Sequence, residues 1–189
     1  MNTELSQKEN LLYRTLLAMA IVVLAAAVRI APHPWNFTPV GAMALFSGAV
    51  LKDRRLAMLF PLLTLFAGDI FIGLYNYKLM LVVYASFLVS VAIGFLLRDR
   101  RTAGRVTAAT LLGAIQFFLV TNFAVWAAGL SYEHNGPGLV MCYIAGIPYF
   151  WNTLAGDALY AVLFFGGFAL AERLFPVFRA PQTLSLRRQ

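Results

Sequence analysis

The chain has 189 residues and a net charge of +7; 61% of its residues are hydrophobic and only 12% are charged. A soluble globular protein is typically about 25% charged and about 45–50% apolar, so this composition excludes an ordinary soluble domain. The positive charge sits in short clusters beside apolar stretches and forms no basic stripe, so we expect no nucleic-acid partner. A single cysteine, Cys142, excludes an internal disulfide and a CxxC motif.

Six apolar stretches have the composition of membrane spans, for which about 20 apolar residues are needed, with a range of about 17–25. The expected spans cover residues 11–29, 37–51, 56–74, 79–97, 106–130 and 152–174. We therefore predict an all-α membrane protein in the lipid bilayer, in which residues 1–189 form one transmembrane domain of six helices.

Two of these stretches differ from a simple span. Residues 37–51 are short and rich in small side chains, which suits a helix buried among others, although a re-entrant hairpin is the alternative. In the last apolar stretch Pro148 removes a helix hydrogen bond, and Asn152 can start a new helix. We therefore predict a short helix at the outer surface over residues 139–147, with the sixth span beginning near Asn152.

Thirteen of the fifteen Lys and Arg residues lie on one side of the predicted bundle. They fall before or at the start of the first span, between the second and third, between the fourth and fifth, and around the end of the last. The other connections hold only Arg29 and Lys78. Because positive charge is retained on the cytoplasmic side of short loops, we predict that both termini are cytoplasmic.

Polar residues gather at the opposite, outer end. Asp69 and Asp157 each follow an Ala-Gly pair inside an apolar span, which is compatible with an internal repeat and equally with chance. Because a carboxylate in hydrocarbon is costly unless it is paired or hydrated, we expect Arg29 to pair with one of them. We expect the main cavity to open at this end under the loop around His33, with walls formed by Asp69, Asn122, Trp126, Asn152 and Asp157.

Four stretches resemble a family of small bacterial membrane proteins with a transport role. They are RIAPHPWNFTPVGAMALFSGA (29–49), the AGD that ends at Asp69, TNFAVW (121–126) and PYFWNTLAGDALY (148–160). That family is similar to the substrate-binding S-components of energy-coupling factor (ECF) vitamin transporters, and this chain is most similar to their solitary cobalamin-binding branch. The resemblance covers nearly the whole chain.

The resemblance implies an S-component-like bundle in the bacterial cytoplasmic (inner) membrane that binds a vitamin-like solute from the outer side. A corrinoid such as cobalamin is the expected transported ligand, and no cofactor or metal is expected. An ECF energising module is the implied partner unless the protein works alone. The cobalamin branch uses a cysteine as a cobalt ligand, whereas the stretch from Asp69 to Tyr84 offers Met80 and no cysteine. The expected substrate-binding residues are His33, Trp35, Asn36, Asp69, Met80, Tyr84, Asn122, Trp126, Trp151, Asn152 and Asp157.

Two other functions are compatible with the sequence. A structural or assembly protein would use its buried aspartates only to pair with arginine. An intramembrane aspartyl protease would use Asp69 and Asp157 as a dyad that shares a proton. The GxGD motif of such proteases lacks its first glycine at both sites, where Phe66 and Leu154 stand instead. We therefore expect no enzymatic activity.

Overall fold

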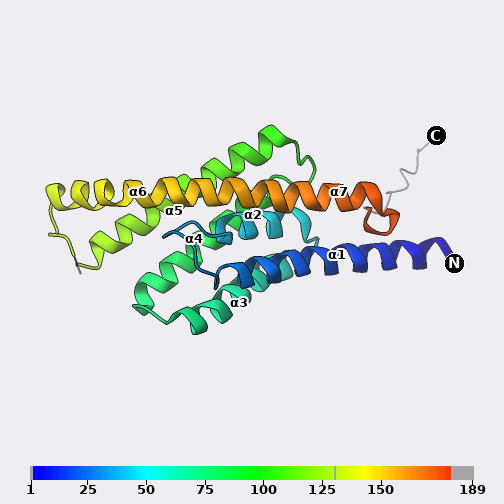
Figure 1. Cartoon of the computed structure of the whole chain (residues 1–189), viewed down its shortest axis with the longest axis horizontal. Coiled ribbons are helices and arrows are strands. Elements are labelled where there is room, and N and C mark those ends of the chain that lie inside the picture. Colours follow the sequence, from blue (N-terminus) through cyan, green and yellow to red (C-terminus); the bar gives the residue numbers. More distant parts are fainter. Residues whose placement is uncertain (1, 130, 180–189) are drawn as a thin grey trace.

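The computed structural model describes residues 2–129 and 131–179 (Figure 1). Within these residues the regular secondary structure is entirely helical, as predicted. The elements are α1 (Asn2–Val28), α2 (Val40–Val50), α3 (Arg54–Ile72), α4 (Tyr77–Phe95), α5 (Ala103–Ala127), α6 (Gly136–Ala161), the π-helical segment η1 (Val162–Gly166), α7 (Gly167–Leu174) and the 3-10 turn η2 (Pro176–Phe178).

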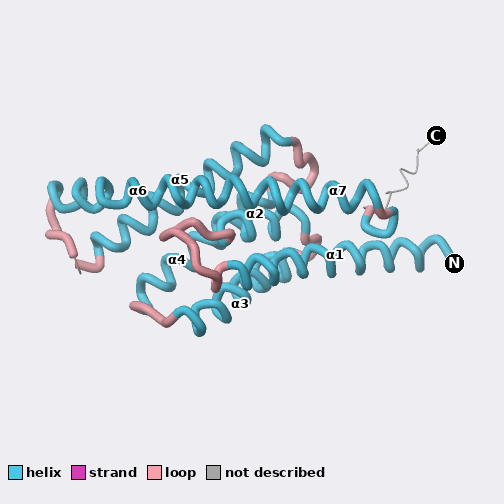
Figure 2. Tube along the Cα trace, in the orientation of Figure 1, coloured by secondary structure: helices cyan, strands magenta, loops and turns pink. Residues whose placement is uncertain are grey.

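Five helical stretches of the described residues are long and apolar enough to cross a membrane. They are Gln7–Val28, Arg54–Ile72, Tyr77–Phe95, Ala103–Ala127 and Gly136–Leu174. Helix α2 has 11 residues, or about 16 Å of helix, which is shorter than a hydrocarbon core of about 30 Å. The connection 29–39 doubles back toward the middle of the bundle before α2 begins (Figure 2).

The connections lie at two ends of the bundle (Figure 1). We call the end with the α2–α3 and α4–α5 connections the basic end, and the end with residues 29–39, residues 73–76 and the α5–α6 connection the polar end. The first residues of α1 and the last of α7 lie at the basic end. There, Glu172 forms ion pairs with Arg14 at 3.1 Å and with Arg101 at 3.4 Å, which tie α7 to α1 and to the start of α5.

Helix α2 lies in the core, where it packs against α1, α3, α4, α5 and α6. Its contact with α4 is a backbone contact. A Cβ atom at Gly48 would collide with the carbonyl of Val91, and a Cβ atom at Gly94 would collide with the carbonyl of Leu45. Small residues therefore let two helices approach closely, as the composition of residues 37–51 predicts for a buried helix.

Both ends of α2 meet a side chain of complementary charge. Arg98 donates hydrogen bonds to the carbonyls of Gly48 at 2.9 Å and of Leu51 at 2.7 Å, at the C-terminal end. The backbone N–H of Ala42, at the N-terminal end, donates to Asp157 Oδ1 at 2.9 Å. An acidic group at the N-terminus and a basic group at the C-terminus both complement the helix dipole, so these contacts stabilise a helix too short to cross the membrane.

A proline inside α3 is accommodated by a neighbouring side chain. Pro61 has no N–H, so the carbonyl of Ala57, four residues earlier, loses its helical donor. The hydroxyl of Ser47 on α2 donates to this carbonyl at 2.7 Å. Ser47 is fully buried, and its hydrogen bond therefore satisfies a backbone group that water does not reach.

The predicted break in the last apolar stretch is wrong. Helix α6 begins at Gly136, runs through Pro148 without interruption and continues through η1 and α7 to Leu174, a total of 39 residues. There is no separate helix over 139–147, and the N-cap is Asn135, whose side chain accepts from the N–H of Gly138 at 2.8 Å. A proline removes one hydrogen bond, which a helix packed among other helices tolerates.

Candidate functional site

An ion pair joins three helices near the polar end. Arg29, which follows α1, places Nη2 2.6 Å from Asp69 Oδ1 on α3, and its Nη1 donates to the carbonyl of Leu65 at 3.4 Å. The hydroxyl of Tyr84 on α4 donates to the other oxygen of Asp69. Asp69 is only 1% exposed. The ion pair that we expected for Arg29 thus forms with Asp69 and links α1, α3 and α4.

The two Ala-Gly-Asp tripeptides share a local geometry. At Gly68 a Cβ atom would lie 3.1 Å from Arg29 Nη1, and at Gly156 it would lie 3.1 Å from the backbone nitrogen of Thr38. Each glycine therefore lets a neighbouring segment approach the helix. The aspartate that follows each glycine, Asp69 or Asp157, is buried.

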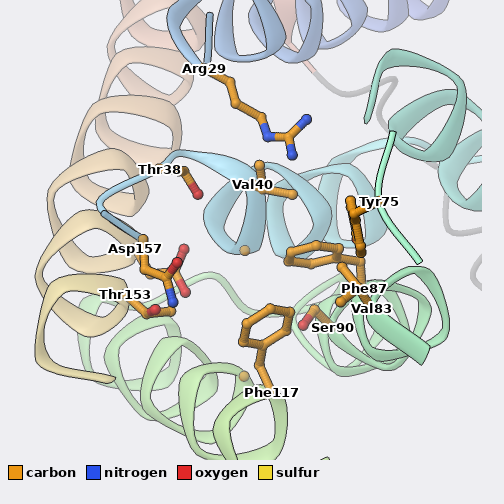
Figure 3. A pocket seen from close by; sticks show the side chains of 13 residues that line it. Arg29, Thr38, Val40, Tyr75, Val83, Phe87, Ser90, Phe117, Thr153 and Asp157 are labelled. Atoms are coloured by element: carbon orange, nitrogen blue, oxygen red, sulfur yellow. The ribbon is translucent and has the colours of Figure 1, made fainter. Parts of the chain in front are cut away.

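A cavity of about 210 Å³ lies beside the ion pair, among α2, α4, α5 and α6 (Figure 3). Its wall at the polar end includes Arg29, Asn36 and Tyr75, whereas Ser90 and Asp157 lie deeper. Ser90 is 13 residues beyond Tyr77, the first residue of α4, which is about 20 Å along the helix axis. The cavity therefore extends from the polar end into the middle of the bundle. Its other walls are Thr38, Val40, Gly41, Val83, Phe87, Gly113, Phe117 and Thr153.

Asp157 is the buried acid of this cavity and is 4% exposed. The backbone N–H of Ala42 donates to its carboxylate at 2.9 Å, and the backbone N–H of Gly41 also interacts with it. None of the ion pairs between described residues includes Asp157. Asp69 and Asp157 bind different partners, and no hydrogen bond between described residues joins them. This separation disfavours the shared-proton dyad of an aspartyl protease.

The remaining walls are aromatic or carry neutral polar groups. The rings of Phe87 on α4 and Phe117 on α5 stack with centroids 4.9 Å apart. Gln116 donates to Ser90 Oγ at 3.2 Å and orients that hydroxyl. Burial, and then the nearby Asp69 carboxylate, raise the pKa of Tyr75 to about 12, so its hydroxyl is neutral at physiological pH.

Five of the residues expected from the sequence lie in or around the cavity. Asn36 and Asp157 line it. Asp69 and Tyr84 lie behind Arg29 and hold it in place. Asn152 donates to the carbonyl of Trp35 at 2.9 Å and so fastens the connection 29–39 to α6.

The structure does not bring the other expected residues to the cavity. Those that do not line it are His33, Trp35, Met80, Asn122, Trp126 and Trp151. Trp35 is 81% exposed, and Trp126 donates to the carbonyl of Glu133 within the α5–α6 connection at 2.9 Å. His33 contacts the carbonyl of Arg29 at 3.0 Å, and Asn122 lines a smaller hollow of about 170 Å³ between α5 and α6. Trp35 and Trp151 have the exposure expected of residues at a membrane interface.

The residues that sequence reasoning missed have weak signals. Ser90 stands in a row of small residues at spacing four with Ser86 and Gly94, which is typical of helix packing. Phe87 and Phe117 are two of sixteen phenylalanines, so composition does not distinguish them. Only the topology brings them together.

A hollow larger than the polar cavity lies elsewhere among the described residues. A groove of about 550 Å³ between α5 and the α6–α7 helix begins at Arg101, near the basic end, and has mostly apolar walls. Val162 in this groove is 71% exposed, which is typical of a side chain that faces lipid. Our expectation that the polar cavity is the main cavity is therefore wrong, because the apolar groove has the larger volume. We choose the polar cavity as the candidate site because a buried carboxylate lines it.

The fold and the buried polar cavity define an all-helical protein with membrane-length helices. Residues 9–179 match a family of unknown function, DUF6580, and the chain belongs to this family. No curated protein and no solved structure matches the chain.

Proposed function

We propose that this protein binds a vitamin-like solute on the outer side of the bacterial cytoplasmic membrane and takes part in its uptake, in the manner of an ECF S-component. The observation that carries the proposal is the cavity that leads from the polar end to the buried carboxylate of Asp157. Ligand sites are typically concave and mostly apolar, with a few polar groups that orient the ligand. This cavity has that composition.

The charge distribution supports the orientation. Most of the positive charge lies at the basic end, whereas the polar end carries only Arg29 and, in the first turn of α4, Lys78. Positive charge marks the cytoplasmic side of short connections. The cavity then opens toward the outside, which suits the capture of a solute.

The cavity size favours a small solute. Pockets for drug-sized ligands have volumes of about 300–1,000 Å³. A corrinoid, the ligand that the resemblance implies, is larger than such ligands, and the cavity measures about 210 Å³. A corrinoid would enter only if the connection 29–39 moved away from α6.

Native mass spectrometry of protein purified in a mild detergent tests this proposal. The matched variants are Gly113→Leu, which fills the cavity, and Gly113→Ala, whose Cβ atom would meet only Ser90 Oγ at 3.7 Å. We expect the wild type and Gly113→Ala to release the same small molecule and Gly113→Leu to release none. A visible absorption spectrum reveals any corrinoid. If no cell extract yields a bound solute for the wild type, the proposal is wrong.

The second candidate is a structural or assembly protein, which the Arg29–Asp69 pair favours because it stabilises the bundle without any ligand. Such a protein would be recovered from native membranes with a constant protein partner, and Gly113→Leu would leave this partner in place. Recovery of an ATP-hydrolysing module would instead identify the energy source of an uptake system. If this protein is recovered with a bound solute but without a protein partner, it acts as a solitary transporter.

A further inference from the structure

The two buried aspartates differ in how their charge is compensated. Arg29 lies 2.6 Å from Asp69, and the hydroxyl of Tyr84 donates to the same carboxylate. Asp157 interacts with the backbone N–H groups of Ala42 and Gly41, and within residues 2–129 and 131–179 no basic side chain forms an ion pair with it. One carboxylate is thus neutralised by a guanidinium and the other is not.

When Asp157 is ionised, the cavity therefore carries an excess of negative charge. The charged residues of its wall are Arg29 and Asp157, and Arg29 is already paired with Asp69 outside that wall. The N-terminus of α2 contributes about half a positive charge, which offsets Asp157 only in part. A buried carboxylate at this depth is costly unless it gains a proton or a cationic partner. The cavity offers room for such a partner beside Asp157.

The opposite wall suits a flat apolar group. Phe87 and Phe117 stack with an interplanar angle of 26° and present their rings to the cavity (Figure 3). Aromatic faces also attract cations within about 6 Å of the ring centroid. The hydroxyl of Thr153 lies beside Asp157 on α6, and that of Ser90 lies near Phe87 on α4 (Figure 3). Each can accept a hydrogen bond from an ammonium group.

We propose that the cavity binds a small organic monocation with a flat ring, whose ammonium group pairs with Asp157 and whose ring packs against Phe87 and Phe117. This inference rests on the proposed function and names the chemical class of its solute. An anionic solute is disfavoured, because Arg29 is already committed to Asp69 and the carboxylate of Asp157 would repel a second negative charge.

Three probes of nearly equal shape test the charge requirement: benzylammonium, benzyl alcohol and benzoate. Binding to the purified full-length protein is measured by titration calorimetry and by the rise in melting temperature. We expect benzylammonium to bind and the other two to bind far more weakly. Asp157→Asn should weaken benzylammonium binding by about tenfold or more, because removal of one partner of a buried charge pair lowers affinity.

A second variant tests the same charge requirement without changing Asp157, in case Asp157→Asn does not fold. Thr153 lies one helical turn before Asp157, so Thr153→Lys places an internal ammonium next to the carboxylate. This variant should keep its melting temperature and lose benzylammonium binding, whereas the uncharged control Thr153→Gln, which removes the same hydroxyl, should bind benzylammonium more tightly than the lysine variant. Equal binding in the lysine and glutamine variants would contradict the inference.

The inference is also wrong if benzoate binds as well as benzylammonium, or if none of the three probes binds. Its failure differs from failure of the proposed function. Recovery of a bound anionic solute would agree with the proposed uptake function and would refute the proposal that the solute is a cation. Binding of benzylammonium at Asp157, combined with no recovered solute and no uptake, would keep the site and refute the transport role.

Discussion

The carboxylate of Asp157 occupies the space that a side chain at Gly41 would need. A Cβ atom at Gly41 would collide with both carboxylate oxygens, and the N–H of the next residue, Ala42, donates to one of them. The first N–H groups of a helix have no partner within it, so the carboxylate satisfies one of these donors. Helix α2 is held by α6 at this end and by Arg98 at the other.

Gly41→Ala should therefore destabilise the protein and distort the cavity. The added methyl group would force Asp157 away from α2, and overpacking of this kind costs about 1–3 kcal/mol. Thermal unfolding in detergent measures the change. The matched control is Gly104→Ala in α5, where a Cβ atom would meet nothing within 4 Å. The control should unfold at the wild-type temperature or slightly above it, and equal melting temperatures for both variants would contradict the close contact.

Arg29→Ala should lower the melting temperature markedly. It leaves the buried carboxylate of Asp69 without its cation, and the removal of one partner of a buried ion pair costs about 3–5 kcal/mol. The double variant Arg29→Ala, Asp69→Asn should recover part of the loss, because the remaining group is then uncharged. Lys78→Ala, which removes the other basic residue of the polar end, serves as the control. A wild-type melting temperature for Arg29→Ala would show that the pair contributes little to stability.

Ser47 and Pro61 should behave as a coupled pair. Ser47→Ala removes the hydroxyl that donates to the carbonyl of Ala57, and an unsatisfied buried carbonyl costs about 1–3 kcal/mol. Pro61→Ala restores an N–H at the position that normally donates to this carbonyl. The loss caused by Ser47→Ala should therefore be much smaller in the Pro61→Ala background. A double-mutant cycle of unfolding free energies measures the coupling, and strictly additive changes would refute it.

The sequence predicted the helices well because apolar runs and their flanking charges are local features. It failed at Pro148, where the local rule predicts a break. There, the packed surroundings of a membrane helix tolerate the lost hydrogen bond, and α6 continues. The short α2 also shows that local sequence is not sufficient, because the residues that stabilise its two ends, Asp157 and Arg98, lie far away in the sequence.

The candidate site could be predicted only where charge is rare. Arg29, Asp69 and Asp157 stand out because ionisable groups in apolar spans are unusual. The pairing partner was left open, since depth alone does not tell whether Arg29 reaches α3 or α6. The walls formed by Phe87 and Phe117 were missed, because only the packing of α4 against α5 distinguishes these two rings from the other phenylalanines.

The orientation of the bundle makes a final prediction. Single cysteines at Ser131 in the α5–α6 connection and at Thr102 before α5 would lie at opposite ends, and both positions are exposed. The background variant is Cys142→Ser, because the buried thiol of Cys142 donates to the carbonyl of Asn122 at 3.3 Å and a hydroxyl can replace this donor. A membrane-impermeant maleimide applied to intact spheroplasts should label Ser131→Cys at once and Thr102→Cys only after permeabilisation. The charge distribution predicts this order. The reverse order would place the cavity mouth on the cytoplasmic side, where the site could receive a solute for export but could not capture one from outside.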